Sequence, residues 1–156
     1  MGREISRDYM GRNVTIVGIL KGSFVFLADL IREIRSDVTV EVDFMSVSSY
    51  GDGTTSSGTV RIEKDVEVTI SGKDVIIVED IVDSGLTLAN VYDIFSGRGA
   101  TSIRVATLLH KPGNSKYNRK LDYVGFKIPD RFVIGYGLDY AQRYRNLPDI
   151  RVLNEI

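Results

Sequence analysis

Two adjacent carboxylates interrupt an otherwise apolar part of the stretch Val75–Leu88 (VIIVEDIVDSGLTL). Four apolar residues come first, Glu79 and Asp80 follow, and Asp83 stands three residues further on. The stretch contains no Lys or Arg, so no cation accompanies these carboxylates in the sequence. Carboxylates of this kind bind hydroxyl groups, which donate hydrogen bonds, or Mg²⁺, which prefers oxygen ligands. The stretch therefore has the side chains to bind a sugar, a divalent cation or both.

The residues after the acidic pair have two possible roles. Asp83 or Ser84 can simply cap a helix. A cap leaves unexplained why Gly85 is accepted in the first turn, where Gly weakens a helix by about 1 kcal/mol relative to Ala. Phosphate binding explains it, because amides at a helix start bind anions, Gly lets the backbone approach closely, and the Ser84 and Thr87 hydroxyls donate. No GxxxxGK[ST] motif is present, so the pattern favours a sugar phosphate rather than a nucleoside triphosphate.

Short apolar runs alternate with helical patterns along the chain, which indicates βαβ units and an α/β fold with a mainly parallel twisted sheet flanked by helices. Helices are predicted within Met1–Asn13, after a possible cap at Ser23, and around Leu88–Phe95, where Gly97 and Gly99 end the pattern. Strands are predicted at Val14–Leu20, Val38–Phe44 (half-exposed, because it alternates), Thr59–Ile70, Val75–Val78, Ile103–Leu109, Tyr123–Ile128 and Phe132–Gly137.

In such sheets a ligand binds beyond the carboxyl ends of the strands. Several charged residues each follow a predicted covered strand, so we expect them along one rim of the sheet: Lys21, Glu79, Asp80, Asp83 and Lys111.

The composition narrows the class of protein. A length of 156 residues predicts one domain over residues 1–156, and a net charge of −1 argues against a nucleic-acid partner. No apolar run approaches the roughly 20 residues that span a bilayer, and no export signal opens the chain. Cysteine is absent, which excludes disulfides and thiolate metal sites. We therefore expect a cytoplasmic protein with no membrane or nucleic-acid partner.

The stretch Val75–Leu88 resembles the phosphoribosyl pyrophosphate motif of the type I phosphoribosyltransferases. Five further segments are similar to the bacterial hypoxanthine-guanine phosphoribosyltransferases: ILKGS (Ile19–Ser23), DFMSVSSYG (Asp43–Gly51), LLHKP (Leu108–Pro112), DYVGFKIPDRFVIGYGLDY (Asp122–Tyr140) and YRNLP (Tyr144–Pro148). The resemblance implies the type I phosphoribosyltransferase fold with a small hood region. It also implies purine salvage: transfer of 5-phosphoribosyl from phosphoribosyl pyrophosphate to N9 of hypoxanthine or guanine, giving IMP or GMP and pyrophosphate.

The same resemblance implies roles on the ribose side. Asp83 is the candidate general base, near N7 of the purine. Lys21, Gly22 and Arg145 correspond to pyrophosphate contacts, and the Leu20–Lys21 peptide is expected to adopt the cis form. The phosphate and ribose would be held by Glu79, Asp80, Asp83, Ser84, Gly85, Leu86 and Thr87, with Mg²⁺ as the cofactor on Glu79, Asp80 and Asp139.

On the purine side, Lys111 corresponds to the residue that contacts O6 of the purine. The resemblance implies that it is the second catalytic residue, after Asp83. A donor there suits hypoxanthine or guanine and suits adenine poorly. Phe132 resembles the ring that stacks on the purine, Val133 offers backbone hydrogen bonds, and Asp139 completes the purine-binding set. Ser49 and Tyr50 begin a loop that resembles a closing lid.

Simpler interpretations stay open for several of these residues. Lys21 can be a solvated strand end, Arg145 a surface residue, Phe132 a core residue, and the loop after Ser49 an ordinary turn. His110 stands where bacterial relatives carry Asp, and a surface imidazole with no role is expected. Relatives also carry a further helical segment before the region matching Gly2–Tyr9, which this chain is expected to lack.

Other functions also fit parts of the sequence. One is a regulator that binds phosphoribosyl pyrophosphate and reads DNA or RNA, and another is a phosphoribosyltransferase that prefers xanthine or a pyrimidine. The near-neutral charge and the intact purine-side set argue against the regulator. A homo-oligomer, either a dimer or a tetramer, is expected from the family resemblance alone.

Overall fold

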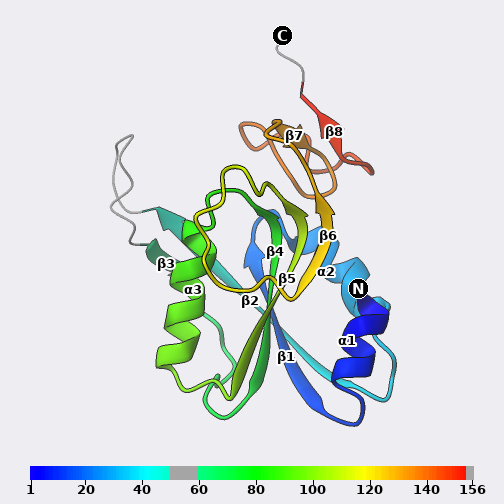
Figure 1. Ribbon diagram of the computed structural model, residues 1–156, viewed down its shortest axis with the longest axis vertical. Coiled ribbons are helices and arrows are strands. Elements are labelled where there is room, and N and C mark those ends of the chain that lie inside the picture. The colour runs from blue at the N-terminus through cyan, green and yellow to red at the C-terminus, as the bar shows by residue number, and fades with distance from the viewer. Residues whose placement is uncertain (50–59, 154–156) are drawn as a thin grey trace.

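The computed structural model describes residues 1–49 and 60–153, which form a twisted six-stranded sheet with helices on both faces (Figure 1). The strand order is β3-β2-β1-β4-β5-β6, and every neighbouring pair is parallel except β2–β3. The elements of the sheet are β1 (Asn13–Leu20), β2 (Thr39–Ser49), β3 (Val60–Lys64), β4 (Asp74–Val82), β5 (Ser102–His110) and β6 (Tyr123–Lys127). The predicted mainly parallel α/β fold is confirmed.

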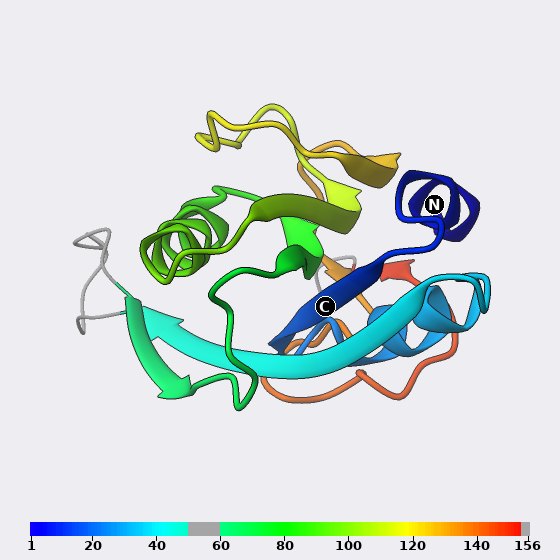
Figure 2. The same cartoon turned by 90° about the horizontal axis from the view of Figure 1, so that it is seen from below.

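The helices are α1 (Gly2–Asp8), α2 (Phe24–Arg32) and α3 (Leu86–Gly97). Viewed along the strands, α3 lies on one side of the sheet and α1 and α2 on the other (Figure 2). A second, antiparallel sheet of β7 (Val133–Ile134) and β8 (Arg151–Val152) lies beyond the carboxyl ends of the parallel strands (Figure 1). Within the described residues, none of these helices combines the length and apolar character needed to cross a membrane.

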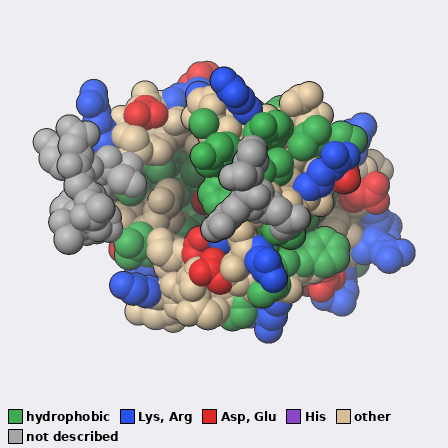
Figure 3. Space-filling model, turned by 90° about the horizontal axis from the view of Figure 1, so that it is seen from above, with side chains coloured by type: hydrophobic (Ala, Val, Ile, Leu, Met, Phe, Trp, Pro, Cys, Tyr) green, Lys and Arg blue, Asp and Glu red, His purple; other side chains and the backbone are tan. Residues whose placement is uncertain are grey.

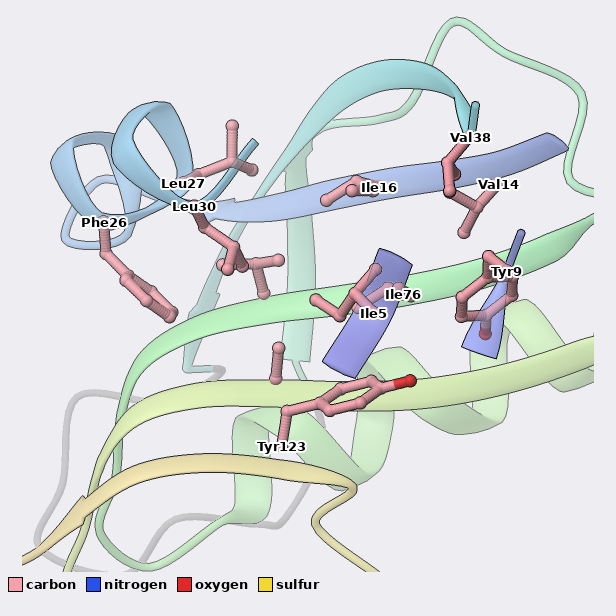
Figure 4. Close-up of a cluster of buried hydrophobic side chains, with 12 residues drawn as sticks. Ile5, Tyr9, Val14, Ile16, Phe26, Leu27, Leu30, Val38, Ile76 and Tyr123 are labelled. Atoms are coloured by element: carbon pink, nitrogen blue, oxygen red, sulfur yellow. The ribbon is translucent and has the colours of Figure 1, made fainter. Parts of the chain in front are cut away.

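Two hydrophobic clusters fill the space between the sheet and its helices. The cluster on the α1–α2 side includes Ile5, Ile16, Leu30 and Tyr123 (Figure 4), and the cluster on the α3 side includes Phe95. Because both faces are covered, the central strands are apolar on both sides, as the continuous apolar runs predicted. Burial on both faces holds the strands rigidly and so fixes where their carboxyl ends lie.

Several predicted element boundaries are wrong. β4 does not end at Val78 but continues to Val82, and the predicted strands Thr59–Ile70 and Phe132–Gly137 shrink to β3 and the two-residue β7. Ser23 does not cap α2 with its side chain, because its hydroxyl donates to the carbonyl of Ile19 at 2.6 Å.

The alternating, half-exposed pattern predicted for β2 is wrong at the centre of the strand. Val42 is 37% exposed, whereas Asp43, expected on the polar face, is 8% exposed. The Asp43 carboxylate accepts hydrogen bonds from the backbone N–H groups of Glu67 (2.6 Å) and Val68 (3.0 Å), and so holds the loop that leads to β4. Burial alone would raise the pKa of Asp43, but these hydrogen bonds outweigh burial and hold it below its ordinary value.

Asp43→Asn tests this role. Oδ2 accepts both loop N–H groups and Oδ1 accepts the N–H of Phe44 at 2.7 Å, so an amide, which has one acceptor oxygen, leaves at least one of these three N–H groups without its partner. We expect the free energy of unfolding to fall by about 1–3 kcal/mol near neutral pH. Because the pKa of Asp43 is lowered in the folded state, the wild type loses this contribution as the pH falls through that value. Urea unfolding from about pH 7 down to about pH 3 should therefore show the two proteins converging.

The exposed Asp93 provides the control, since Asp93→Asn should change the unfolding free energy by less than about 0.5 kcal/mol. The role of the ionised Asp43 carboxylate would be contradicted if the unfolding free energy of Asp43→Asn stayed below that of the wild type by the same amount over this pH range.

Candidate active site

A pocket of about 230 Å³ opens at the carboxyl ends of β1 and β4, beside the start of α3. This end of the molecule faces the viewer in Figure 3, where acidic side chains lie near the centre of the face. Most of the predicted phosphate and ribose residues line the pocket, whose wall is formed by Ile19, Leu20, Gly22, Val47, Glu79, Asp80, Ile81, Val82, Asp83, Ser84, Gly85, Thr87 and Leu88.

Glu79 and Asp80 belong to β4 itself rather than to the segment after it, and Glu79 pairs in register with Thr107 of β5. Burial, together with the neighbouring Asp80 carboxylate, raises the pKa of Glu79 well above its ordinary value, and burial also raises the pKa of Asp80. Glu79 Oε2 is buried and has no hydrogen-bond partner among the described residues. Two adjacent carboxylates with spare acceptor capacity are suited to a divalent cation or to sugar hydroxyls, so this donor set fits Mg²⁺.

The acidic pair depends on a glycine in the turn that follows the neighbouring strand β1. A Cβ atom on Gly22 would lie 1.8 Å from Asp80 Oδ2, so any larger residue would displace that carboxylate. Gly22 follows the Leu20–Lys21 peptide, which is cis as predicted. The structure therefore brings the predicted pyrophosphate loop into contact with the predicted ribose-binding pair.

The start of α3 differs from both cap predictions. The N-cap residue is Gly85, in the left-handed region at φ 76°, and it makes no side-chain cap; Ser84 Oγ, one residue earlier, accepts a long hydrogen bond of 3.4 Å from the N–H of Leu86. A Cβ atom on Gly85 would lie 2.6 Å from the Cβ of Tyr117, so the backbone turns tightly against the loop that follows β5. The first N–H groups of a helix have no partner within the helix, which leaves this turn suited to bind an anion.

Asp83 faces Lys111 instead of capping the helix. Lys111 Nζ lies 3.1 Å from Asp83 Oδ2 and 3.2 Å from Asp130 Oδ1, and Asn114 Nδ2 donates to Asp83 Oδ1 at 3.0 Å. Burial works against the charge on Lys111, but its two carboxylate partners raise the pKa above the ordinary value for lysine. The two residues predicted to be catalytic are therefore in direct contact, with the ammonium group charged.

A second group of polar residues lies between β1 and the segment before β8. Lys21 Nζ donates to Gln142 Oε1 at 3.3 Å, and Arg145 reaches the same oxygen at 3.2 Å. Arg145 also forms an ion pair with Asp139 at 3.0 Å and donates to the carbonyl of Gly137. The structure thus brings together both predicted pyrophosphate cations, and it pairs one of them with the predicted second metal ligand.

Phe132 is 52% exposed, so its interpretation as a core residue is wrong. Its ring meets Tyr140 edge to face, with 5.7 Å between centroids, and Val133 begins β7. Neither Phe132 nor Val133 lines the pocket at β4. Exposed aromatic rings beyond the carboxyl ends of the strands are available to stack on a planar ligand.

The predictions for the lid and for His110 have different outcomes. Ser49 is the last residue of β2, but Tyr50 lies outside the described residues, so the lid stays a prediction. His110 is not a simple surface imidazole: its Nδ1 is buried, and burial, together with nearby Lys127, lowers its pKa.

Sequence reasoning gave no role to three residues that hold this site together, namely Asp130, Asn114 and Gln142. Asp130 lies within a segment that resembles the family, Asn114 in the loop after β5, and Gln142 between two such segments, but a polar residue in a loop has no periodic signal. Only their contacts with Asp83, Lys111 and Lys21 identify them.

Residues 2–141 match the phosphoribosyl transferase domain family. The chain belongs to this family. It is 52% identical over 153 residues to the hypoxanthine-guanine phosphoribosyltransferase of Bacillus subtilis (strain 168), covering 98% of this chain and 84% of that protein. It is 51% identical over 153 residues to the bifunctional protein TilS/HprT of Listeria monocytogenes serotype 4b (strain F2365), of which it spans 23%.

The fold is also similar to a solved structure of the family. The TM-score is 0.93, at 48% identity, with the crystal structure of a hypoxanthine phosphoribosyltransferase from Staphylococcus aureus, over 98% of this chain and 82% of that one. The type I phosphoribosyltransferase fold predicted from the sequence is confirmed.

The turn at Gly85 generates a prediction that separates the cost of the left-handed backbone conformation from the cost of crowding against Tyr117. Gly72 has φ 75° and open space around it, whereas Gly85 has φ 76° and Tyr117 against it. Gly72→Ala should therefore lose about 1 kcal/mol of unfolding free energy from the backbone conformation alone. Gly85→Ala should lose at least about 1 kcal/mol more, because the loop must also move. Urea unfolding of both variants measures the difference, and equal losses would contradict the tight contact with Tyr117.

Proposed function

We propose that this protein transfers the 5-phosphoribosyl group of phosphoribosyl pyrophosphate to N9 of hypoxanthine or guanine, forming IMP or GMP and pyrophosphate. The observation that carries the proposal is the meeting of three features in one place: the acidic pair with the partnerless Oε2 of Glu79, the glycine turn of α3, and the contact between Asp83 and Lys111. The names of the B. subtilis and S. aureus relatives support the same activity.

On the ribose side, the turn Ser84–Thr87 would hold the 5′-phosphate with its N–H groups and hydroxyls, because exposed amides at a helix start attract anions. Glu79 and Asp80 would accept hydrogen bonds from the ribose hydroxyls. Lys21, Gly22 and Arg145 would contact the pyrophosphate.

The acidic pair and, separately, Asp139 would also hold Mg²⁺, which supplies positive charge to the leaving pyrophosphate when bound; within the described residues the three carboxylates do not form one cluster. Asp139 is already paired with Arg145, so it would exchange this partner to act as a ligand.

Asp83 would act as the general base that takes the proton lost when the purine attacks C1′. A positioned carboxylate contributes typically about 10²–10⁴-fold to the rate. Lys111 would donate to O6 of the purine, and Phe132 would stack on its ring. A lid formed by the loop after Ser49 would exclude water from the reacting ribose.

The setting of this activity is also proposed. We propose that a single domain carries it, that the protein acts in the cytoplasm, for which the absence of cysteine is the support, and that it assembles as a homodimer or homotetramer.

The direct test is a nucleotide-forming assay. The protein is mixed with Mg²⁺, phosphoribosyl pyrophosphate and, separately, hypoxanthine, guanine, xanthine, adenine and uracil. We expect IMP and GMP to form at the highest rates and adenine to react poorly. A rate with xanthine higher than the rates with hypoxanthine and guanine would make xanthine the substrate instead. Folded protein that turns over none of the bases would favour the alternative of a regulator that binds phosphoribosyl pyrophosphate.

Asp83→Asn tests the base. The amide keeps the shape of the side chain but cannot take a proton, so kcat should fall by about 10²–10⁴-fold. The affinity for phosphoribosyl pyrophosphate, measured by calorimetry, should change by less than about threefold, since its binding groups remain. Comparable losses in kcat and in affinity would remove the assigned role.

A further inference from the structure

Lys111 is a buried cation, and hydrogen bonds hold both its backbone and its ammonium group. It is 7% exposed, and its backbone N–H donates to the carbonyl of Val82, the residue before Asp83, at 2.9 Å. Its Nζ lies between two carboxylates, at 3.1 Å from Asp83 and 3.2 Å from Asp130. Asp130 is an exposed residue in the segment between β6 and β7, so the two carboxylates come from different parts of the chain.

An ammonium group has three N–H donors arranged tetrahedrally. Two of them are directed at Asp83 and Asp130, which fixes the direction of the third. With one carboxylate alone, two donors would remain available, in two different directions. The second carboxylate occupies one of them and leaves a single donor direction for a ligand.

Asn114 closes the arrangement. Its Nδ2 donates to Asp83 Oδ1, the oxygen that Lys111 does not use. The same amide also interacts with Asp130, and the hydrogen bonds from Asn114 and Lys111 hold the pKa of Asp130 below its ordinary value. Asp130 therefore stays ionised and oriented toward Lys111 at neutral pH.

We propose that Asp130 is a positioning residue for the purine: with Asp83, it occupies two donors of Lys111 and directs the third toward the oxygen on C6 of a 6-oxopurine. The inference rests on the proposed function, because it assumes that the purine lies over Lys111. It adds a residue that sets base specificity without touching the reacting atoms. A 6-aminopurine offers a donor where this arrangement needs an acceptor.

The test compares two ligands that differ only by the base. IMP and ribose 5-phosphate are titrated by calorimetry into the wild type, Asp130→Ala, Asp130→Asn and the control Asp93→Ala, which removes a similarly exposed carboxylate bound to Arg119. For Asp130→Ala we expect IMP to bind about 10-fold more weakly and ribose 5-phosphate to bind unchanged. Asp130→Asn should lie between, since its amide oxygen still accepts a hydrogen bond, and Asp93→Ala should match the wild type.

Steady-state rates give the second readout. For Asp130→Ala the KM for hypoxanthine should rise with little change in the KM for phosphoribosyl pyrophosphate, and the preference for hypoxanthine over adenine should fall. IMP affinity equal to that of the wild type, or equal weakening of IMP and ribose 5-phosphate, would overturn the role of Asp130 while leaving the proposed function intact. A wild type that bound neither ligand would overturn both. If Asp130→Ala does not fold, Asp130→Asn decides by the same comparison.

Discussion

The partial burial of two adjacent carboxylates near the end of β4 is the constraint on which the site depends. Burial raises the pKa of both Glu79 and Asp80, and no Lys or Arg within the described residues forms an ion pair with either. The two groups can be ionised together only when something else supplies positive charge or hydrogen-bond donors. The strand is held in place by apolar packing on both faces, so these two half-buried side chains stay at the carboxyl end of the sheet. The central strand therefore presents a fixed acidic site that suits a cation or hydrogen-bond donors.

The two ends of the sheet differ in whether their polar side chains already have partners. A larger pocket, of about 610 Å³, lies at the amino ends of β1, β2 and β4. Its charged side chains already neutralise one another, since Arg12 pairs with Asp74 and Lys73 with Glu41. The smaller pocket at the carboxyl ends has a partnerless acceptor and a helix start instead. Unmet interaction capacity, more than volume, is the reason for proposing the ligand site at the carboxyl end of the sheet.

The sequence could predict the parts of this structure that repeat a pattern. Continuous apolar runs such as Val14–Leu20 identified the strands covered on both faces, and the rule for parallel sheets placed Lys21, Asp83 and Lys111 at one rim. Sequence periodicity could not show that β4 continues through Glu79 and Asp80, because its pairing with β5 outweighs the local polarity. It also could not show the left-handed conformation at Gly85, which depends on close packing against a distant loop.

The most direct test of the central claim is a crystal structure of the protein with IMP. The account predicts ribose hydroxyls at Glu79 and Asp80, the 5′-phosphate on the turn Ser84–Thr87, and the purine O6 beside Lys111. Nucleotide bound instead in the pocket between Arg12 and Lys73, with the carboxyl-end pocket occupied by solvent alone, would contradict it.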